Sequence, residues 1–353
     1  MQHIKNLVEQ DLYIFFESIG EKRFRTQQLF NALYQQRINN FDTISTFSVQ
    51  LKEQLKNNFL IDSIEVETIR ESSDGSKKIL YKIINENINK KEYIETVFLP
   101  NNVNNKNKKN TICISTMIGC PVNCKFCATA KLGYKRNLTT SEIIDQILIT
   151  ERILNQKINN VVIMGMGEPL LNYDNTINAI KILIKHNIIN HRNITLSTIG
   201  FPSKIVELAD SNLKIKLALS LHSPFDDIRK SIIPLANSLS DTFSAIEYYY
   251  KKTKLPITFE YILFSGLNNR DRDVFQLLKL TKKIPSKVNI IPFNDISFTK
   301  AKHDLKAATN KEINLFSKKL YQKKIMAIIR KSQGQDIEAA CGQLAYSKNN
   351  NYK

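Results

Sequence analysis

The chain has 353 residues, 42% of them hydrophobic, enough for one large α/β domain with a small appendage. Lysine and arginine (51) outnumber aspartate and glutamate (33), so the net charge of +18 favours a polyanionic partner, although the sequence is also rich in Lys, Asn and Ile, as a biased genome would produce. The N-terminus has no apolar core and no apolar stretch approaches the ~20 residues of a membrane span, so we expect a cytoplasmic protein without a signal peptide or a membrane segment.

Residues 1–60 place apolar side chains at helical spacing and predict a compact helical module. Lys22, Arg23 and Arg25 lie near the start of its second helix. The polar face that they form is a candidate RNA contact, although a solvated face is the default interpretation of such a pattern.

Residues 61–100 change to the period of strands. We expect strands at 61–69, 77–84 and 93–99, with a turn at 72–76, where Ser, Asp and Gly follow one another. This part predicts a short antiparallel sheet extension that links the helical module to the main domain.

Strands and helices alternate in the main domain, residues 101–330. We expect strands at 111–116, 160–164, 193–197, 215–221, 258–263, 288–291 and 324–329. Helices are expected at 140–154, 175–185, 204–209, 238–252, 271–281 and 311–321. Such alternation indicates parallel βαβ units, so the predicted fold is α/β, an open or partial barrel of (β/α)6 type with function at the C-terminal ends of its strands. Residues 331–353 are expected to form a C-terminal loop that contains Cys341.

Three of the five cysteines, Cys120, Cys124 and Cys127, form a C-x3-C-x2-C run just after the first expected barrel strand. Three thiolates this close can hold an iron–sulfur cluster and leave one iron open to a small molecule, whereas electron-transfer clusters use four cysteines. Structural zinc is the alternative, but it requires four ligands and the sequence has no second C-x2-C pair. Because Cys113 and Cys341 are single and far apart, the spacing favours a cluster over zinc.

Polar groups follow several expected strands at the same end. Gly165 and Gly167 would let the backbone approach a ligand, and Glu168 could bind an ammonium group. Alone, this segment is a poor dinucleotide fingerprint, because the third glycine and an immediate helix are missing. Later strands are followed by further candidates, namely Ser197, Ser220, Leu221, His222 and Asn294. Each alone is an ordinary strand-end side chain, but their recurrence indicates a common site.

The cysteine spacing and the Gly-Glu-Pro segment resemble the radical S-adenosylmethionine (SAM) enzymes, and the whole chain resembles the RlmN family of dual-specificity RNA methyltransferases. The runs behind this resemblance span nearly the full chain, namely 93–97, 113–120, 124–130, 136–138, 165–172, 220–222, 291–294 and 339–344. Three positions depart from the family pattern. Ile199 replaces a second serine, which weakens the placement of SAM contacts there, and Gln333 and Gln335 replace Arg and Asp, which would loosen the C-terminal loop or the grip on RNA.

The resemblance implies a substrate, a cluster and a cofactor. It implies methylation of C2 of an adenine in 23S rRNA and of the adenine beside the anticodon in tRNA. Cys120, Cys124 and Cys127 would hold a [4Fe–4S] cluster whose open iron binds SAM. Further contacts to SAM would come from Gly167, Glu168, Ser197, Ser220, Leu221, His222 and Asn294.

The resemblance also implies how the other cysteines react. Cys341 would take a methyl group from one SAM, and a second SAM would give the deoxyadenosyl radical that activates this methyl for addition to C2. Glu95 would remove the C2 proton, and Cys113 would release the RNA by forming a transient disulfide with Cys341. A cellular dithiol would reduce the disulfide, and an electron donor would supply the cluster. The adenine must be unstacked, and we expect the enzyme to act as a monomer.

Two other functions stay open. Relatives with the same two reactive cysteines methylate C8 of the same adenine and confer antibiotic resistance; the long N-terminal module and the context of Glu95 favour C2. A non-catalytic iron–sulfur RNA-binding protein would need neither the Gly-Glu-Pro segment nor the pair formed by Cys113 and Cys341.

Overall fold

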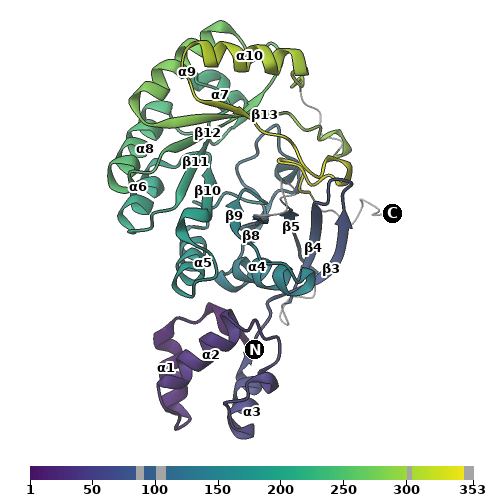
Figure 1. Ribbon diagram of the computed structural model, residues 1–353, viewed down its shortest axis with the longest axis vertical. Helices are drawn as coiled ribbons and strands as arrows, with labels where there is room; N and C mark the ends of the chain where they lie inside the picture. The colour runs from purple at the N-terminus through teal and green to yellow at the C-terminus, as the bar shows by residue number, and fades with distance from the viewer. Residues whose placement is uncertain (85–90, 101–108, 300–303, 346–353) are drawn as a thin grey trace.

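The computed structural model describes residues 1–84, 91–100, 109–299 and 304–345. Within these residues seven parallel strands neighbour one another in chain order, namely β6 (Thr111–Cys113), β9 (Asn160–Ile163), β10 (Ile194–Thr198), β11 (Lys216–Ser220), β12 (Ile257–Leu263), β13 (Ser286–Pro292) and β14 (Ala327–Ile329). A helix follows each of the first six, and β14 adds a seventh strand. The predicted α/β partial barrel is therefore confirmed, and Figure 1 shows its curved sheet with the helices outside.

The outer helices agree closely with the expected ranges. They are α4 (Thr140–Leu154), α5 (Tyr173–Lys185), α6 (Pro202–Asp210), α8 (Leu239–Thr253), α9 (Asp271–Lys283) and α10 (Asn310–Gln322). The short helix α7 (Asp226–Ile232) was not predicted. Its seven residues include only two apolar ones, Ile228 and Ile232, over less than two full turns, too few for a helical period to be recognised.

The antiparallel extension consists of β3 (Ile64–Glu71), β4 (Lys77–Ile83) and β5 (Tyr93–Leu99). It continues the barrel sheet, because β5 pairs antiparallel with β6 and aligns Val97 with Cys113. The three strands cover the edge of β6, which would otherwise present unpaired backbone groups. The result is a sheet of ten strands within the described residues.

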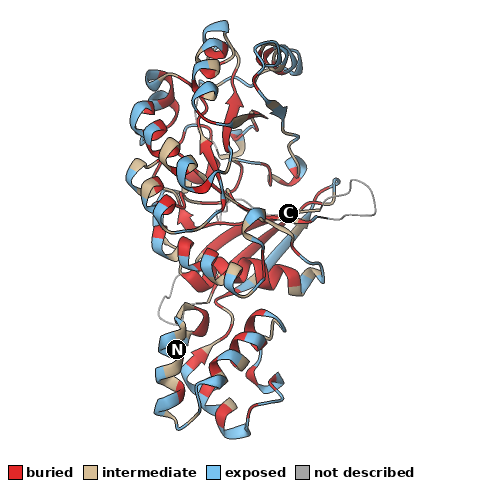
Figure 2. Cartoon of the chain, turned by 60° about the vertical axis from the view of Figure 1, so that its left-hand side comes forward, coloured by how far each residue is buried: buried red, intermediate tan, exposed pale blue. Residues whose placement is uncertain are grey.

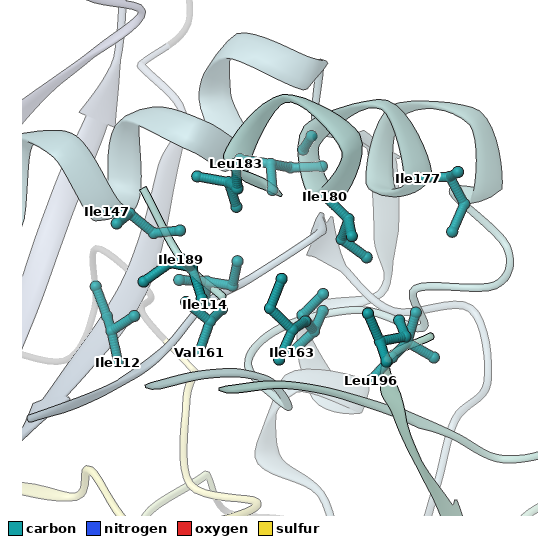
Figure 3. Packing of buried hydrophobic residues seen from close by; sticks show 14 of the residues in the cluster. Ile112, Ile114, Ile147, Val161, Ile163, Ile177, Ile180, Leu183, Ile189 and Leu196 are labelled. Carbon is teal, nitrogen blue, oxygen red and sulfur yellow. The ribbon is translucent and has the colours of Figure 1, made fainter. Parts of the chain in front are cut away.

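The sheet packs against the outer helices through branched aliphatic side chains. Figure 3 shows Ile147 of α4 and Ile180 and Leu183 of α5 above Val161 and Ile163 of β9. The buried residues of α5 recur every three or four positions, as in a helix with one face on a core. This packing fixes the strands whose C-terminal ends surround the candidate site.

The N-terminal helices α1 (Glu9–Ser18), α2 (Phe24–Tyr34) and α3 (Val49–Asn58) group at one end of the molecule (Figure 1). A short parallel pair, β1 (Gln2–His3) and β2 (Phe59–Leu60), joins their two chain ends. The group contacts the barrel through a buried ion pair of Lys5 with Asp145 and through Tyr34, whose ring stacks on His186 at 4.5 Å. Figure 2 shows that the outer faces of these helices are largely exposed.

Two further strands, β7 (Met117–Gly119) and β8 (Tyr134–Asn137), form an antiparallel pair beside the barrel and enclose the cysteine run. None of the helices in the described part of the chain is both long and apolar enough to cross a membrane.

Candidate active site

A cavity of about 880 Å³ opens at the C-terminal ends of the parallel strands. Below, it is called the cluster cavity. The three cysteines of the C-x3-C-x2-C run line it together with five of the residues expected to contact SAM, namely Gly167, Glu168, Ser197, Ser220 and His222. Residues from the cysteine loop and from five neighbouring strands thus meet in one space, although they are far apart in the sequence.

The β7–β8 pair shapes the cysteine loop. Gly119 at the end of β7 has φ +74°, and a Cβ atom there would lie 1.6 Å from the carbonyl oxygen of Gly133, so only glycine fits. The Cys120 amide donates a hydrogen bond to the same oxygen at 3.1 Å. The amide of Ala128, just after Cys127, donates to the carbonyl oxygen of Gly342 at 2.7 Å. The loop is therefore held at both ends, and its second end contacts the segment that contains Cys341.

The three thiols fit a [4Fe–4S] cluster chemically. Burial raises the pKa of the Cys120 thiol to about 12 and also raises the pKa values of Cys124 and Cys127, so without a cation these thiols stay protonated. Metal binding is what turns such buried thiols into thiolates. In the described residues no three His, Cys, Asp or Glu side chains converge closely enough to hold a single metal ion. A cluster differs in this respect, because each cysteine binds a different iron.

Glu168 is held by the backbone around it. Its carboxylate accepts hydrogen bonds from the amides of Leu170 (3.2 Å) and Ile199 (2.9 Å), and burial raises its pKa to about 7. Ile199 makes this contact through its backbone amide, so the replacement of the family's serine by isoleucine at position 199 does not remove the hydrogen bond. Gly167 has φ +105°, and a Cβ there would lie 2.7 Å from the side chain of Met117. The glycine lets the chain pass closely enough to point Glu168 inward.

Ser197, Ser220 and His222 face the cavity from β10, β11 and the residues after β11. The two serine hydroxyl oxygens lie 3.4 Å apart. His222 Nδ1 accepts a hydrogen bond from the amide of Ile262 at 3.0 Å, and burial lowers the pKa of the ring to about 3. The imidazole is therefore neutral, with its proton on Nε2, and can donate one hydrogen bond to a ligand.

Two of the expected SAM contacts do not line the cluster cavity. The side chain of Leu221 is fully buried in the core, and only its backbone lies near the strand ends. Asn294 instead holds the C-terminal segment, because its Nδ2 donates to the carbonyl oxygen of Cys341 at 3.0 Å. Its Oδ1 accepts from Gln335 Nε2 at 2.8 Å. The departure at Gln335 thus supplies a contact that stabilises the loop.

Cys341 lies between the cluster cavity and a second cavity of about 580 Å³, here called the outer cavity. Cys113, Val97 and Leu99 line the outer cavity as well. Burial and the nearby Cys341 raise the pKa of the Cys113 thiol to about 12. The surrounding protein also raises the pKa of Cys341, although part of that residue is exposed to solvent. Both cysteines are free thiols. One thiol therefore faces both cavities, and the other lies near it in the second.

Glu95 is fully buried on β5 and lines neither cavity. Because side chains alternate along a strand, it shares its face with Val97 and Leu99, which line the outer cavity. Lys78 Nζ on β4 lies 3.1 Å from Glu95 Oε1, and the lysine is only 3% exposed. No sequence pattern singled out Lys78, since a lone lysine in a strand is usually solvated.

Two other charged residues near the site were also missed. Arg229 on α7 is fully buried and donates hydrogen bonds to the carbonyl oxygens of Ile199 and Ser220, which joins the ends of β10 and β11. Arg330 follows β14 and lines both cavities. In a sequence with 51 Lys and Arg residues, neither arginine stands out.

The chain matches known proteins over nearly its full length. Residues 114–278 match the model of the radical SAM superfamily, and residues 2–61 match that of the ribosomal RNA large subunit methyltransferase N-terminal domain. The chain is 40% identical to the probable dual-specificity RNA methyltransferase RlmN of Clostridium novyi (strain NT), with 99% of this chain and 100% of the relative covered. It is also 40% identical to the protein of the same description from Thermotoga sp. (strain RQ2), over 98% of this chain and 97% of that one.

A solved structure shows the same fold over the full length. The crystal structure of a radical SAM methyltransferase from Sphaerobacter thermophilus matches with a TM-score of 0.88 at 31% identity, covering 98% of this chain and 99% of that one. The resemblance inferred from the motifs is thereby confirmed along the whole chain. With its cysteine run and Gly-Glu-Pro segment at one cavity, the chain belongs to the RlmN family of the radical SAM superfamily.

Proposed function

We propose that this protein is an RNA methyltransferase that methylates C2 of an adenine in 23S rRNA, at the peptidyl transferase centre, and of the adenine 3′ of the anticodon in tRNA, using two SAM molecules per turnover. The observation that supports it best is the position of Cys341, which faces both the cavity of the three cysteines and the outer cavity next to Cys113. The names of the relatives, dual-specificity RNA methyltransferases, support two RNA substrates.

In the proposed reaction Cys120, Cys124 and Cys127 hold one [4Fe–4S] cluster, and the cluster with SAM supplies the methyl group and the radical chemistry. The chain binds and orients SAM. Glu168 is placed to bind its ammonium group, and the two serines and neutral His222 offer hydroxyl and N–H groups to the remaining polar atoms. Leu221 would contribute through its backbone, and Asn294 indirectly, by holding Cys341 in place.

Cys341 is the residue that moves the methyl carbon. Its sulfur, as a thiolate, would take the methyl group as the S–C bond of SAM breaks. After the SAM-derived radical removes one hydrogen atom from this methyl, the carbon would join C2 of an adenine in the outer cavity, and the surplus electron would return to the cluster. Glu95 accepts the proton that C2 loses. Cys113 then attacks the sulfur of Cys341, so that a disulfide forms, the sulfur–carbon bond breaks and the carbon takes up a proton as the new methyl group. A cellular dithiol reduces the disulfide, and a separate donor supplies electrons to the cluster.

Apart from the target adenine, the RNA would be held outside these cavities. We assign residues 1–60 to an RNA-binding module, 61–100 to the sheet extension, 101–330 to the barrel and 331–353 to the C-terminal segment, of which 346–353 lie outside the described residues. The net charge of +18 supports binding to a polyanion. We further propose that the protein acts as a monomer in the cytoplasm, where both RNA substrates are found.

The test is mass spectrometry of 23S rRNA and tRNA from cells that lack the gene and from cells complemented with wild type or with Cys341→Ala. The proposal expects 2-methyladenosine to disappear on deletion and to return with wild type only. If an 8-methyl species follows the gene instead, the enzyme has the regiochemistry of the resistance type. If no methyladenosine changes, the protein is not this methyltransferase, and RNA binding without catalysis becomes the leading function.

A further inference from the structure

Arg330 lies at the boundary of the two cavities, where Cys341 also lies. Its backbone amide donates to the carbonyl oxygen of Ile290 at 2.9 Å, which continues the pairing of β13 with β14 and sets where the side chain leaves the sheet. Its Nη1 lies 3.6 Å from the sulfur of Met164 after β9, across the barrel mouth. The guanidinium therefore reaches over the space that the two reactive thiols share.

A buried carboxylate faces the same space. Glu260 on β12 is 4% exposed and lines the cluster cavity together with Arg330. One of its oxygens, Oε1, accepts a hydrogen bond at 3.1 Å from Asn289, the residue directly opposite on β13. The other oxygen, Oε2, has no hydrogen-bond partner among the described residues. A buried carboxylate of this kind needs a nearby positive charge, and Arg330 acts on it more strongly than Lys287 does.

The charges around the two thiols come from several elements. The pKa of Cys341 is lowered by the charge of Arg330 and raised by the carboxylate of Glu260 and by the cluster ligand Cys127. The pKa of Cys113 is raised by Cys341 and lowered by Arg330. Arg330 is the cation that acts on both thiols, and it opposes the effect of burial on each pKa. Lys331 also lines the outer cavity, but it is not among the charges that shift either thiol.

We propose that Arg330 is the positioning residue of the cysteine pair, whose guanidinium stabilises the thiolate of Cys341 when it takes the methyl group and that of Cys113 when it attacks Cys341. Glu260, itself oriented by Asn289, places a negative charge at the same cavity and attracts the guanidinium electrostatically. The inference rests on the proposed function, which uses both thiols as nucleophiles. Each thiol gives its proton to solvent in the cavity before it reacts. Arginine suits this role because it stays charged at every physiological pH and its planar group can face two partners at once.

The test uses the full-length, cluster-free protein and needs neither SAM nor RNA. Alkylation of Cys113 by iodoacetamide is followed by peptide mass spectrometry from neutral to alkaline pH. Cys113 is the main readout, because no cluster ligand is among the charges that act on it. Arg330→Met should move the pH profile upward by about one unit, which slows alkylation about tenfold near neutral pH, since only the thiolate reacts. Arg330→Lys should retain most of the wild-type rate.

Lys331→Met is the matched control, because it removes a neighbouring charge at the same cavity without a predicted effect on the profile of Cys113. If Cys113 shows the same pH profile of alkylation in wild type and in Arg330→Met, the inference is overturned. It is also overturned if Arg330→Lys slows alkylation as much as Arg330→Met does. Circular dichroism checks that each variant is folded. If Arg330→Met does not fold, Arg330→Gln, which keeps hydrogen-bond donors but no charge, is subject to the same two criteria.

The two proposals fail separately. An unchanged alkylation profile would leave methylation by the wild-type enzyme untouched, whereas absence of gene-dependent methyladenosine would leave the alkylation result valid. In the loaded enzyme, Arg330→Met should also form the disulfide of Cys113 with Cys341 more slowly near neutral pH and recover part of the rate at alkaline pH. A variant that acted only on folding would be slow at every pH.

Discussion

Burial, more than any neighbouring charge, sets the protonation state of single residues around the two cavities. It is the largest cause of the raised pKa of Glu168, the lowered pKa of His222 and the raised pKa of Cys113. Each buried ionisable group therefore depends on a specific partner, and removing that partner should have consequences that removal of an exposed charge would not.

Lys78 is such a partner. Lys78→Met leaves the carboxylate of Glu95 buried without its ammonium group at 3.1 Å, so we expect a loss of unfolding free energy of about 3–5 kcal/mol, measured by urea unfolding of the cluster-free protein. Methylation should also fall, because Lys78 Nζ donates to the carbonyl oxygen of Glu338 at 3.2 Å and so connects Glu95 to the segment that contains Cys341.

A double variant and a control make this prediction specific. In Lys78→Met with Glu95→Gln no buried charge is left alone, so stability should largely return while methylation stays reduced by about 10²–10⁴, the usual loss for a general base. Lys82→Met on the same strand breaks only the exposed pair with Glu65 and should change little. Equal effects of the substitutions at Lys78 and Lys82 would contradict the role given to Lys78.

His222 gives a pH dependence with a definite sign. Its pKa in the folded protein is about 3, below the ordinary value of 6.5. Between these two pH values the imidazole binds a proton in the unfolded chain but not in the folded chain. The folded protein should therefore lose stability as the pH falls from about 6.5 towards 3, by about 2 kcal/mol near pH 5 from this residue alone. Urea unfolding of the cluster-free protein should show this loss in wild type and a smaller one in His222→Gln. Parallel pH curves for the two proteins would refute the assignment.

The sequence was most informative about residues whose chemistry depends on local spacing. The cysteine run, Glu168 and His222 were all found in this way, and they meet in the cluster cavity. It did not identify Lys78, Arg229 or Arg330, because their significance depends on burial against strands that are distant in sequence. A charged residue is usually exposed to solvent, so only the three-dimensional structure shows which charged residues are enclosed.

At the scale of elements, the turn between β3 and β4 holds the C-terminal segment. The carboxylate of Asp336 accepts hydrogen bonds from the hydroxyl of Ser72 and the amide of Ser73, and Asp74 Oδ2 accepts one from the amide of Gly334 at 2.8 Å. The sequence predicted this turn and this loop separately. Their contact could not be predicted, because neither pattern contains a signal for its partner some 260 positions away.

Asp336→Ala removes two of these hydrogen bonds. Backbone amides of residues 334–345 should then exchange with deuterium roughly fivefold faster, measured by mass spectrometry of the cluster-free protein, while the barrel strands keep their protection. Asp271→Ala, which removes an exposed carboxylate paired with Lys319 on the far helices α9 and α10, should leave this segment unchanged. Unchanged exchange in Asp336→Ala would show that other contacts, such as Asn294 with Cys341, are sufficient to hold the loop.

At the scale of the whole molecule, the excess of positive charge is distributed differently from what the sequence indicated. In the N-terminal helices, Arg23 forms an ion pair with Glu17 and Arg25 forms one with Glu21 at 3.1 Å. Two of the three cations expected to face RNA are thus partly neutralised, whereas the exposed Lys22 forms no ion pair within the described residues. Both ion pairs join residues only four or six positions apart where α1 leads into α2, a proximity that a count of charges does not consider.

RNA binding should therefore depend on Lys22 more than on either arginine. The logarithm of the association constant for tRNA should fall linearly with the logarithm of salt concentration, and Lys22→Gln should reduce the slope by about 1, the value for one lost phosphate contact. Arg23→Gln should change the slope less, because it also frees the carboxylate of Glu17. Filter binding over a series of salt concentrations measures these slopes. Lys251→Gln on the outer helix α8 is the control and should match wild type; a slope for Lys22→Gln equal to that of the control would mean that RNA does not contact this face.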